Sequence, residues 1–254
     1  MYKIDTKLLY QDTKNNTTIM TESKKTLKPF NDESIQYEIC LDECARGCLF
    51  GRVYASAVVL PKDDSFNHFK MKDSKKIKSR KKMSELSDYI KENSIAYSIQ
   101  YVENDIIDSK NILQANMIAM NECIKQVIPK LNTDISNINL LIDGNYFKQT
   151  PIYDKDQETM RYIPYTTIEK GDGIYSGIAG ASILSKQAHD LYIEDLCVEY
   201  PELITKYGLN TNMGYGTKIH LNGIREHGIT QWHRRTFGEA CKNAQLHIMN
   251  KENT

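Results

Sequence analysis

The chain has 254 residues, of which 40% are hydrophobic and 26% charged, and its 33 basic and 33 acidic residues give a formal net charge of zero. This length can bury a sizeable core, either as one domain with appendages or as two small domains, and the composition is that of a folded globular protein. The balanced charge excludes binding of a polyanion through overall basicity, so any such binding has to rely on local clusters.

Hydrophobicity and cysteine content indicate the cellular setting. No apolar run approaches the roughly 18 residues that a transmembrane helix needs, and the N-terminal MYKIDTKLLY has no signal-peptide pattern. Six cysteines without a secretory signal are typical of free thiols in a reducing compartment. We therefore expect a cytoplasmic protein that does not span a membrane.

The predicted elements follow one another from an extension to an α/β layer domain. Residues 1–36 are polar and rich in Lys, Asn and Thr, which favours a flexible, dispensable extension with one short element at 4–10. Hydrophobic spacing and turn signals first predict strands at 39–41 and 53–60, joined as a hairpin, then a helix at 79–93 capped by Ser79 and a strand at 95–102. A helix at 105–128, stopped by Pro129, and a strand at 138–143 follow. After an irregular insertion at 148–160, we expect a strand at 165–170, a helix at 176–199 and helical pieces at 218–226 and 236–249.

Acidic residues recur where the predicted apolar segments end. Asp42 and Glu43 close the first strand, Asp143 closes a buried strand, and Asp172 lies between a strand and the long helix. Each acid alone is more often a turn or helix cap, but unpaired buried carboxylates are costly, so a group of them favours a cation. Mg²⁺ takes oxygen ligands and shares its shell with substrate phosphates, and a pair of such ions supports phosphodiester cleavage. The pattern therefore predicts a hard-cation site.

Two other motifs favour structural roles. Cys40, Cys44 and Cys48 form C-x3-C-x3-C, which fits neither zinc nor standard iron–sulfur spacing. GDGIYSGIAGAS at 171–182 misses the dinucleotide-binding pattern because Ser176 replaces its third glycine, so glycines for close helix packing are favoured.

Basic residues gather in KMKDSKKIKSRKK at 70–82 and in HRR at 233–235. Each run taken alone is more typical of a solvated face than of a binding site. His220, His227 and His233 are scattered along the C-terminal part, where surface placement or phosphate contact is favoured over metal ligation.

A series of short motifs runs through residues 37–237, in the order LDECARG, AVVLP, DSKKI, NILQANMIAM, LIDGN, KGD, ASILSK, GYGTKIH and HRRTF. In order and spacing they resemble the type 2 ribonucleases H, the ribonuclease HII family. The resemblance implies an α/β, ribonuclease H-like fold: a mixed five-stranded sheet flanked by helices, with a C-terminal helical part. It divides the chain into the extension at 1–36, a catalytic core at 37–200 and a helical part at 201–254, and the insertion at 148–160 lies outside it.

The resemblance also implies roles for individual residues. Asp42, Glu43, Asp143 and Asp172 would hold two Mg²⁺ or Mn²⁺ ions at the scissile phosphate. The segment that senses the ribose 2′-OH falls on Ala45, Arg46 and Gly47, and the tyrosine that stacks on the next deoxyribose falls on Tyr215. Phosphate contacts fall on six further residues, Lys75, Lys76, Asn111, Gln114, Ser182 and Lys186. Three positions depart from the family pattern, namely Ala45 in place of glycine, His189 in place of arginine and Gly180 in place of alanine.

The resemblance implies a monomeric, metal-dependent endonuclease of DNA replication and repair. Its substrates would be the RNA strand of RNA–DNA hybrids and DNA that contains embedded ribonucleotides, and its products would carry 3′-hydroxyl and 5′-phosphate ends. Two alternatives stay open, a DNA nuclease of the same fold and a catalytically weak hybrid-binding module. The complete set of acids argues against the second, and Arg46 with Tyr215 argues against the first, because a 2′-OH is what distinguishes RNA from DNA.

Overall fold

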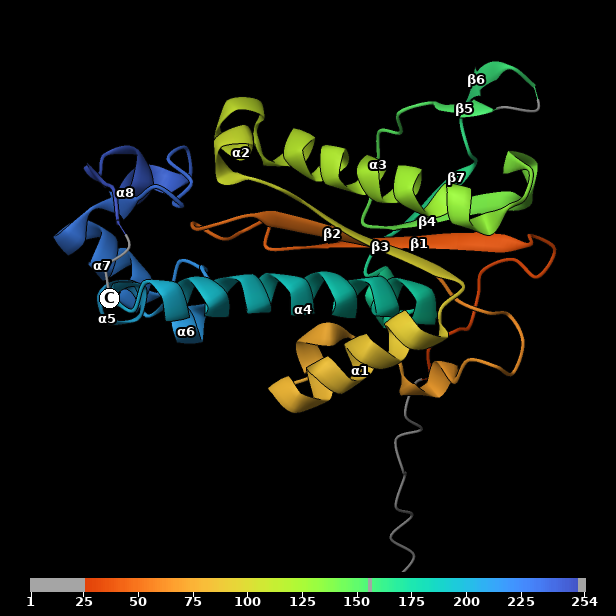
Figure 1. Ribbon diagram of the computed structural model, residues 1–254, viewed down its shortest axis with the longest axis horizontal. Helices are drawn as coiled ribbons and strands as arrows, with labels where there is room; N and C mark the ends of the chain where they lie inside the picture. Colours follow the sequence, from red (N-terminus) through yellow and green to blue (C-terminus); the bar gives the residue numbers. More distant parts are fainter. Residues whose placement is uncertain (1–25, 155–156, 251–254) are drawn as a thin grey trace, which may run out of the picture.

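The centre of the protein is a mixed five-stranded sheet, as the sequence predicts (Figure 1). A computed structural model describes residues 26–154 and 157–250. The sheet has the order β3-β2-β1-β4-β7, in which β1 pairs antiparallel with β2 and parallel with β4. Its strands are β1 (Tyr37–Cys44), β2 (Val53–Val59), β3 (Ala96–Val102), β4 (Ile138–Asp143) and β7 (Tyr165–Ile168).

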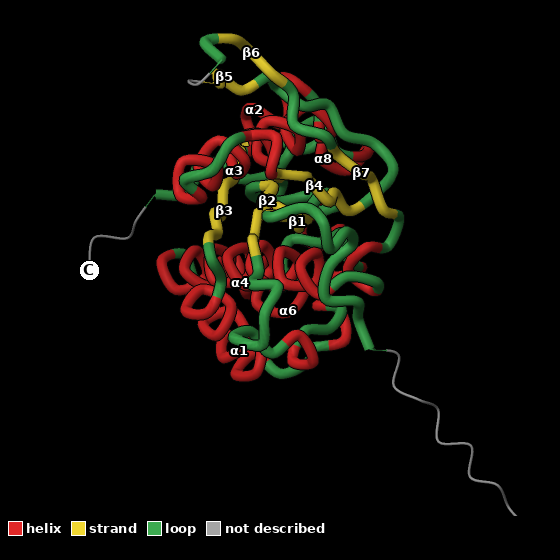
Figure 2. The backbone as a smooth tube through the Cα atoms, turned by 90° about the vertical axis from the view of Figure 1, so that its right-hand side faces the viewer, coloured by secondary structure: helices red, strands yellow, loops and turns green. Residues whose placement is uncertain are grey.

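Helices cover both faces of this sheet, so its central strands β1, β2 and β4 are buried along most of their length (Figure 2). One face packs against α2 (Asn104–Lys110) and α3 (Ile112–Leu131), and the other packs against α1 (Arg80–Asn93) and α4 (Ser176–Glu199). Side chains alternate along β1, so Ile39 and Leu41 enter the α3 core whereas Cys40 enters the α4 core. By the same alternation Asp42 belongs to the α4 side.

The long helix α4 lies unusually close to β1. A Cβ atom added to Gly177 would stand 2.3 Å from the Cys40 Sγ atom, so only glycine permits this packing. The close approach brings the first turns of α4 and the loop before it to the carboxyl end of β1.

The C-terminal part forms a small third core at the far end of α4 (Figure 1). Its elements are α5 (Glu202–Tyr207), α6 (Leu209–Asn212), α7 (Lys218–His227), β8 (Ile229–Thr230), α8 (Gly238–Lys242) and β9 (Leu246–His247). The prediction of helix over 236–249 is wrong beyond residue 242, because Leu246 and His247 pair in parallel with β8 instead.

Two further predictions need correction. The helix predicted at 105–128 is broken at Asn111, which has a φ of +70° and accepts a hydrogen bond from the Gln114 N–H at 3.0 Å, so it caps α3. Pro129 does not stop α3, which runs two residues further to Leu131. The insertion at 148–160 is not irregular throughout, since β5 (Ile152–Asp154) and β6 (Thr159–Arg161) form a hairpin.

The chain before β1 contacts the body of the protein from residue 27 onwards. Lys28 exchanges backbone hydrogen bonds with Ile174 (2.7 Å) and Ser176 (2.9 Å), and the Ser176 hydroxyl donates to the Pro29 carbonyl at 3.0 Å. These contacts brace the loop that leads into α4. The element predicted at 4–10 lies outside the described residues. Among the residues that the structure describes, no helix is long and apolar enough to cross a membrane.

These contacts change the expectation that residues 1–30 are dispensable. We expect a truncation that removes residues 1–30 to be less stable by about 2 kcal/mol than one that removes residues 1–25, because it loses the hydrogen bonds of Lys28 and Pro29, the packing of Leu27 and the contact of Phe30 with Lys62. Urea unfolding of the two truncated proteins measures the difference. Equal midpoints and slopes would mean that Lys28 and its neighbours do not brace α4.

Candidate active site

The four predicted acids lie at the carboxyl ends of β1 and β4, on one side of the sheet. Asp42 and Glu43 end β1 and Asp143 ends β4, and the parallel pairing of Leu41 with Ile142 puts these strand ends side by side. Asp172 lies in a 3-10 turn, Gly171–Gly173, directly before α4. The backbone N–H of Gly171 donates to Asp143 Oδ1 at 2.6 Å, which fixes this turn on the end of β4. We call Asp42, Glu43, Asp143 and Asp172 the acid group.

Electrostatic repulsion links the members of the acid group. Burial raises the pKa of Asp42 well above its ordinary value, and the charges of Glu43 and Asp143 raise it further. The pKa of Asp143 is also raised, first by burial and then by the charges of Asp172 and Glu43, against the lowering effect of the Gly171 N–H. The site therefore holds more negative charge than it can stabilise by itself, which favours an added cation.

Two basic side chains partly compensate the acid group. Arg46 Nη1 lies 2.9 Å from Glu43 Oε1, and Lys75 Nζ lies 3.2 Å from Asp172 Oδ2. Both basic side chains are largely exposed, whereas Glu43 and Asp172 are mostly buried. Within the described residues, no three His, Cys, Asp or Glu side chains stand in a finished metal-binding arrangement. The Glu43 and Asp172 carboxylates are instead turned to their basic partners.

Ser182, which was predicted to hold a phosphate, is a buried residue of α4. It is 5% exposed and its hydroxyl is 2.8 Å from the hydroxyl of Ser74. A hydrogen bond from Ser182 to the Asp42 carboxylate opposes the rise in the pKa of Asp42. Ser182 therefore orients a member of the acid group.

The segment Ala45–Gly47, which we call the ribose turn, follows the acids directly. Ala45 has a φ of +71° and is 2% exposed, so a residue with a side chain occupies the left-handed conformation that glycine tolerates best. This conformation costs an L-residue about 1 kcal/mol, which other interactions in the fold have to offset. Ala45 accepts a hydrogen bond from the Cys48 N–H at 3.3 Å, which closes the turn.

Tyr215 stands beside the ribose turn although it lies far away in the sequence. A Cβ atom built on Gly47 would be 4.0 Å from Tyr215 Cε1, and Cys48 forms an antiparallel bridge with Tyr215. The Tyr215 side chain is 43% exposed, so its ring can contact a ligand. The structure thus brings the acid group, the ribose turn and Tyr215 into one continuous region.

Of the other residues predicted to hold phosphate, only Lys75 contacts the acid group among the described residues. Lys75 does so through Asp172, whereas exposed Lys76 pairs with Asp73 at 3.7 Å. Asn111 and Gln114 are exposed at the N-terminus of α3, where they are joined by the capping hydrogen bond described above. Lys186 is bound to both carboxylate oxygens of Asp190, at 3.1 and 2.8 Å.

Sequence reasoning missed three residues that shape this region. His220, His233 and Arg234 are fully buried, so the expectation of surface placement is wrong for both histidines, and the HRR run is not a solvated basic cluster. The signal available in the sequence was their position in the motifs GYGTKIH and HRRTF. Nothing in the residue pattern predicted their burial, because it depends on contacts across the whole chain.

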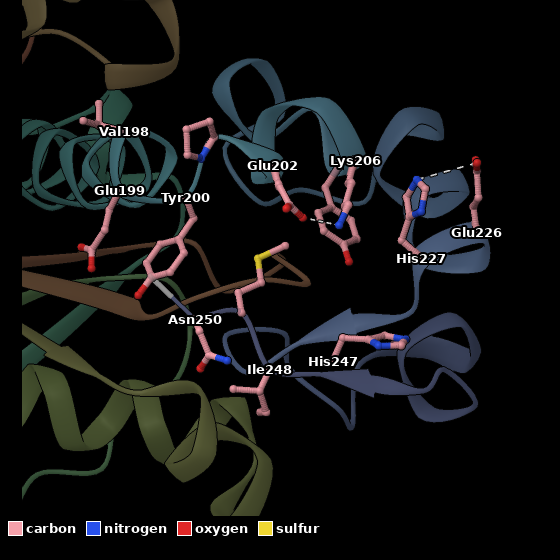
Figure 3. A pocket seen from close by; sticks show the side chains of 13 residues that line it. Val198, Glu199, Tyr200, Glu202, Lys206, Glu226, His227, His247, Ile248 and Asn250 are labelled. Atoms are coloured by element: carbon pink, nitrogen blue, oxygen red, sulfur yellow. Dashed lines mark hydrogen bonds and ion pairs between the residues drawn. The ribbon is translucent and has the colours of Figure 1, made fainter. Parts of the chain in front are cut away.

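A hollow of about 860 Å³ lies in the C-terminal part, away from the acid group (Figure 3). It is lined by the ends of α4, α5 and α7 and by the strand β9, with Tyr200, His227 and His247 among its walls. No member of the acid group lines it. The candidate active site therefore lies at the carboxyl ends of β1 and β4 and not in this hollow.

Comparison with known proteins agrees with this geometry. The family model described as Ribonuclease HII matches residues 39–240, which include all four acids, the ribose turn and Tyr215. The chain belongs to the ribonuclease HII family. A ribonuclease HII of Parabacteroides distasonis is 43% identical over 205 residues, which cover 81% of this chain and 92% of that protein. Members of this family are endoribonucleases, so the protein is a hydrolase of phosphodiester bonds in RNA.

Solved structures share the fold at low sequence identity. The ribonuclease HII of Archaeoglobus fulgidus, solved as a complex with PCNA, superposes with a TM-score of 0.58 at 20% identity and covers 80% of this chain and 95% of that one. Bst ribonuclease HIII in complex with Mn²⁺ has a TM-score of 0.54 at 15% identity, and covers 83% of this chain and 66% of that one. Both confirm the ribonuclease H-like architecture.

The raised pKa of Asp42 predicts an unusual dependence of stability on pH in the metal-free protein. Because the folded pKa lies above the unfolded value of about 3.9, the charged carboxylate destabilises the fold at neutral pH, and this penalty disappears as the pH falls below about 4. We expect Asp42→Asn to raise the free energy of unfolding by at least about 1 kcal/mol at pH 7 and to change it little near pH 4.

Urea unfolding in the presence of a chelator, from pH 4 to pH 8, measures this difference. Asparagine can still accept the hydrogen bond that the Glu43 N–H donates to Asp42 at 2.7 Å, so the substitution removes the charge and preserves that contact. A variant less stable than the wild type at pH 7 would mean that repulsion within the acid group is not the dominant effect.

Proposed function

We propose that the protein cuts the RNA strand of RNA–DNA hybrids and also cuts at ribonucleotides embedded in duplex DNA, with two Mg²⁺ or Mn²⁺ ions and with products that carry 3′-hydroxyl and 5′-phosphate ends. The observation that carries the proposal is the adjacency of the acid group, the ribose turn and Tyr215. The acid group suits phosphodiester chemistry, and the ribose turn with Tyr215 suits recognition of a sugar.

The acid group fits a hard divalent cation by its donor chemistry. All its donors are carboxylate oxygens, and two of the four carboxyl groups have raised pKa values. Asp42, Glu43, Asp143 and Asp172 would hold the ions, which when bound supply an activated water and charge stabilisation at the phosphate. The Glu43 N–H donates to Asp42 at 2.7 Å and the Gly171 N–H donates to Asp143 at 2.6 Å, so backbone groups orient two of the carboxylates before any ion binds.

The Arg46 and Lys75 side chains would turn from carboxylates to phosphates when the ions and the substrate bind. Both ion pairs join a solvent-accessible basic side chain to a mostly buried carboxylate, so solvent and salt screen the basic partner. A divalent cation that binds Glu43 or Asp172 can therefore replace this partner. The released basic groups then lie next to the position of the substrate backbone.

The ribose turn offers backbone donors to the sugar. Among the hydrogen bonds found between described residues, none uses the backbone N–H of Arg46 or of Gly47. A ribose 2′-OH both donates and accepts hydrogen bonds, which lets a polar turn distinguish RNA from DNA. Tyr215 would stack on the next sugar and so require a deoxyribose there, which favours cutting at the junction between RNA and DNA.

The deciding experiment is a cleavage assay on three duplexes, namely DNA with one ribonucleotide, a long RNA–DNA hybrid and DNA alone. With Mg²⁺ or Mn²⁺ we expect the first two to be cut and DNA alone to remain intact, and a chelator should abolish all cleavage. Cleavage of DNA alone would favour a DNA nuclease, and binding of the hybrid without cleavage would favour a silent binding module.

Asp143→Asn should reduce cleavage by at least about 100-fold and leave duplex binding within a few-fold, because it weakens ion binding without removing a basic contact. Asp195→Asn, an exposed acid on α4, is the matched control and should cut at the wild-type rate. Near-normal cleavage by the Asp143 variant would contradict the assignment of the acid group.

The strained conformation of Ala45 predicts the effect of restoring glycine. Ala45→Gly should raise kcat/KM on a single embedded ribonucleotide, on the order of five-fold if about 1 kcal/mol of strain opposes closure of the turn on the sugar. The gain on a long hybrid should be smaller, because many registers are available there. Asn132→Gly, at a φ of +45° in the cap of α3, is the matched control and should leave the ratio of the two kcat/KM values unchanged. Equal gains on both substrates for Ala45→Gly would mean that the turn does not read the junction.

A further inference from the structure

A chain of buried hydrogen bonds ends on the backbone of Tyr215. The Thr230 N–H lies 2.9 Å from His233 Nδ1, His233 Nε2 lies 3.1 Å from His220 Nε2, and His220 Nδ1 lies 3.0 Å from the Tyr215 carbonyl oxygen. Thr230, His233 and His220 are all 0% exposed. We call these three contacts the histidine chain.

The partners at both ends determine the tautomers of the two histidines. The Thr230 N–H can only donate, so His233 Nδ1 accepts and the proton of this neutral ring lies on Nε2. The Tyr215 carbonyl can only accept, so His220 Nδ1 carries the proton and His220 Nε2 is free to accept from His233. Burial lowers the pKa of both rings, which agrees with two neutral histidines at neutral pH.

Arg234, next in the sequence, holds the other side of the same region. Its guanidinium donates to the carbonyl oxygens of Arg46 at 3.1 Å, Gly51 at 2.8 Å and Arg52 at 2.8 Å. The Arg234 backbone N–H donates to the Leu49 carbonyl at 2.8 Å. One short segment, residues 230–234, thus reaches the ribose turn through Arg234 and Tyr215 through the histidine chain.

The surroundings leave this segment little freedom. The ring of His233 packs edge-on against Phe50 and Tyr207, with centroid distances of 4.9 Å in both cases. Phe50 also forms a backbone bridge with His233, and the Leu49 N–H donates to the Gly214 carbonyl at 2.8 Å. These contacts therefore hold together the residues that follow the ribose turn, those that precede Tyr215 and the segment 230–234.

We propose that His220 is a positioning residue for the reaction: through its Nδ1–H it holds the backbone of Tyr215 at the separation from the ribose turn that a ribonucleotide–deoxyribonucleotide junction requires. His233 fixes the tautomer of His220, and Arg234 fixes the opposite side by holding the Arg46 carbonyl. The inference rests on the proposed role of Tyr215 and of the ribose turn, and it adds residues that touch neither substrate nor ions.

Two substitutions at residue 220 separate positioning from packing. The amide nitrogen of Asn can replace His Nδ1 and still donate to the Tyr215 carbonyl, whereas it leaves His233 without an acceptor. Gln places its amide near the position of Nε2, so it keeps a partner for His233 and loses the Tyr215 contact. Both variants should lose stability: Asn leaves the buried His233 Nε2–H without an acceptor, and Gln removes one of the two hydrogen bonds to the Tyr215 carbonyl, the other of which comes from the Thr217 N–H at 2.8 Å.

The readout is the ratio of kcat/KM on a single embedded ribonucleotide to kcat/KM on a long hybrid. We expect His220→Gln to lower this ratio about five- to tenfold, which corresponds to one lost hydrogen bond, and His220→Asn to keep it within about two-fold of the wild type. His227→Gln is the control, because His227 lies on the same helix, pairs with exposed Glu226 and is not part of the histidine chain, and it should keep the ratio. Equal losses for the Asn and Gln variants, or no loss in either, would overturn the proposal.

A double-mutant cycle separates failure of this inference from failure of the proposed function. If His220 acts through Tyr215, His220→Gln should not lower the ratio further in a Tyr215→Ala background. If Tyr215→Ala by itself leaves the ratio unchanged, the proposed function of Tyr215 fails. If Tyr215→Ala lowers the ratio and His220→Gln adds its full effect to that, the positioning role of His220 fails.

The wild-type protein provides a test that does not depend on whether a variant folds. Long-range proton–nitrogen NMR spectra of ¹⁵N-labelled full-length protein at pH 7 report the tautomer of each histidine. We expect His220 to carry its proton on Nδ1 and His233 on Nε2. A His220 ring that carries its proton on Nε2 and not on Nδ1 could not donate to the Tyr215 carbonyl and would overturn the proposal. An imidazolium at His220 would leave the His233 Nε2–H without an acceptor, and one at His233 would oppose the Thr230 N–H, so either would overturn the role of His233 in fixing the tautomer of His220.

Discussion

Repulsion among carboxylates that the fold forces together is the constraint on which the rest of the structure depends. The parallel pairing of β1 with β4 brings Asp42 and Asp143 to one edge, and burial then disfavours their charges. The surrounding residues reduce this cost by hydrogen bonds, from the Glu43 N–H to Asp42 and from the Gly171 N–H to Asp143, and by the ion pairs of Arg46 and Lys75 with Glu43 and Asp172. Selection for stability alone would not retain buried carboxylates that repel one another, so their presence indicates a functional site.

The sequence predicted the parts of the site that strand geometry determines. Acids at the ends of apolar strands are visible in the residue pattern, and parallel strands bring their ends together without any knowledge of distant contacts. The family motifs added Arg46 and Tyr215, and the structure gives their adjacency. Hydrophobic periodicity, a local property, predicted the separate strands and helices, whereas the mixed five-stranded sheet was implied by the family resemblance.

What the sequence did not predict depends on contacts between distant segments. His220, His233 and Arg234 are polar residues that every local rule assigns to the surface, yet they are buried because each finds hydrogen-bond partners elsewhere in the chain. The break at Asn111 was missed for a different reason: the hydrophobic spacing continues across it, and only the positive φ and the capping hydrogen bond reveal it. The pairing of β9 with β8 is likewise a contact that no periodicity encodes.

Contacts with residues 214–215 and 232–234 hold the ribose turn in place, and this has a consequence for biosynthesis. The acid group is complete in the sequence by residue 172, but the segments that hold the ribose turn and Tyr215 come more than 40 residues later. A chain emerging from the ribosome can therefore form its central sheet, with all four carboxylates, well before Arg234 exists to hold the Arg46 carbonyl. The segments that hold the ribose turn and Tyr215 are thus synthesised after all four carboxylates of the acid group.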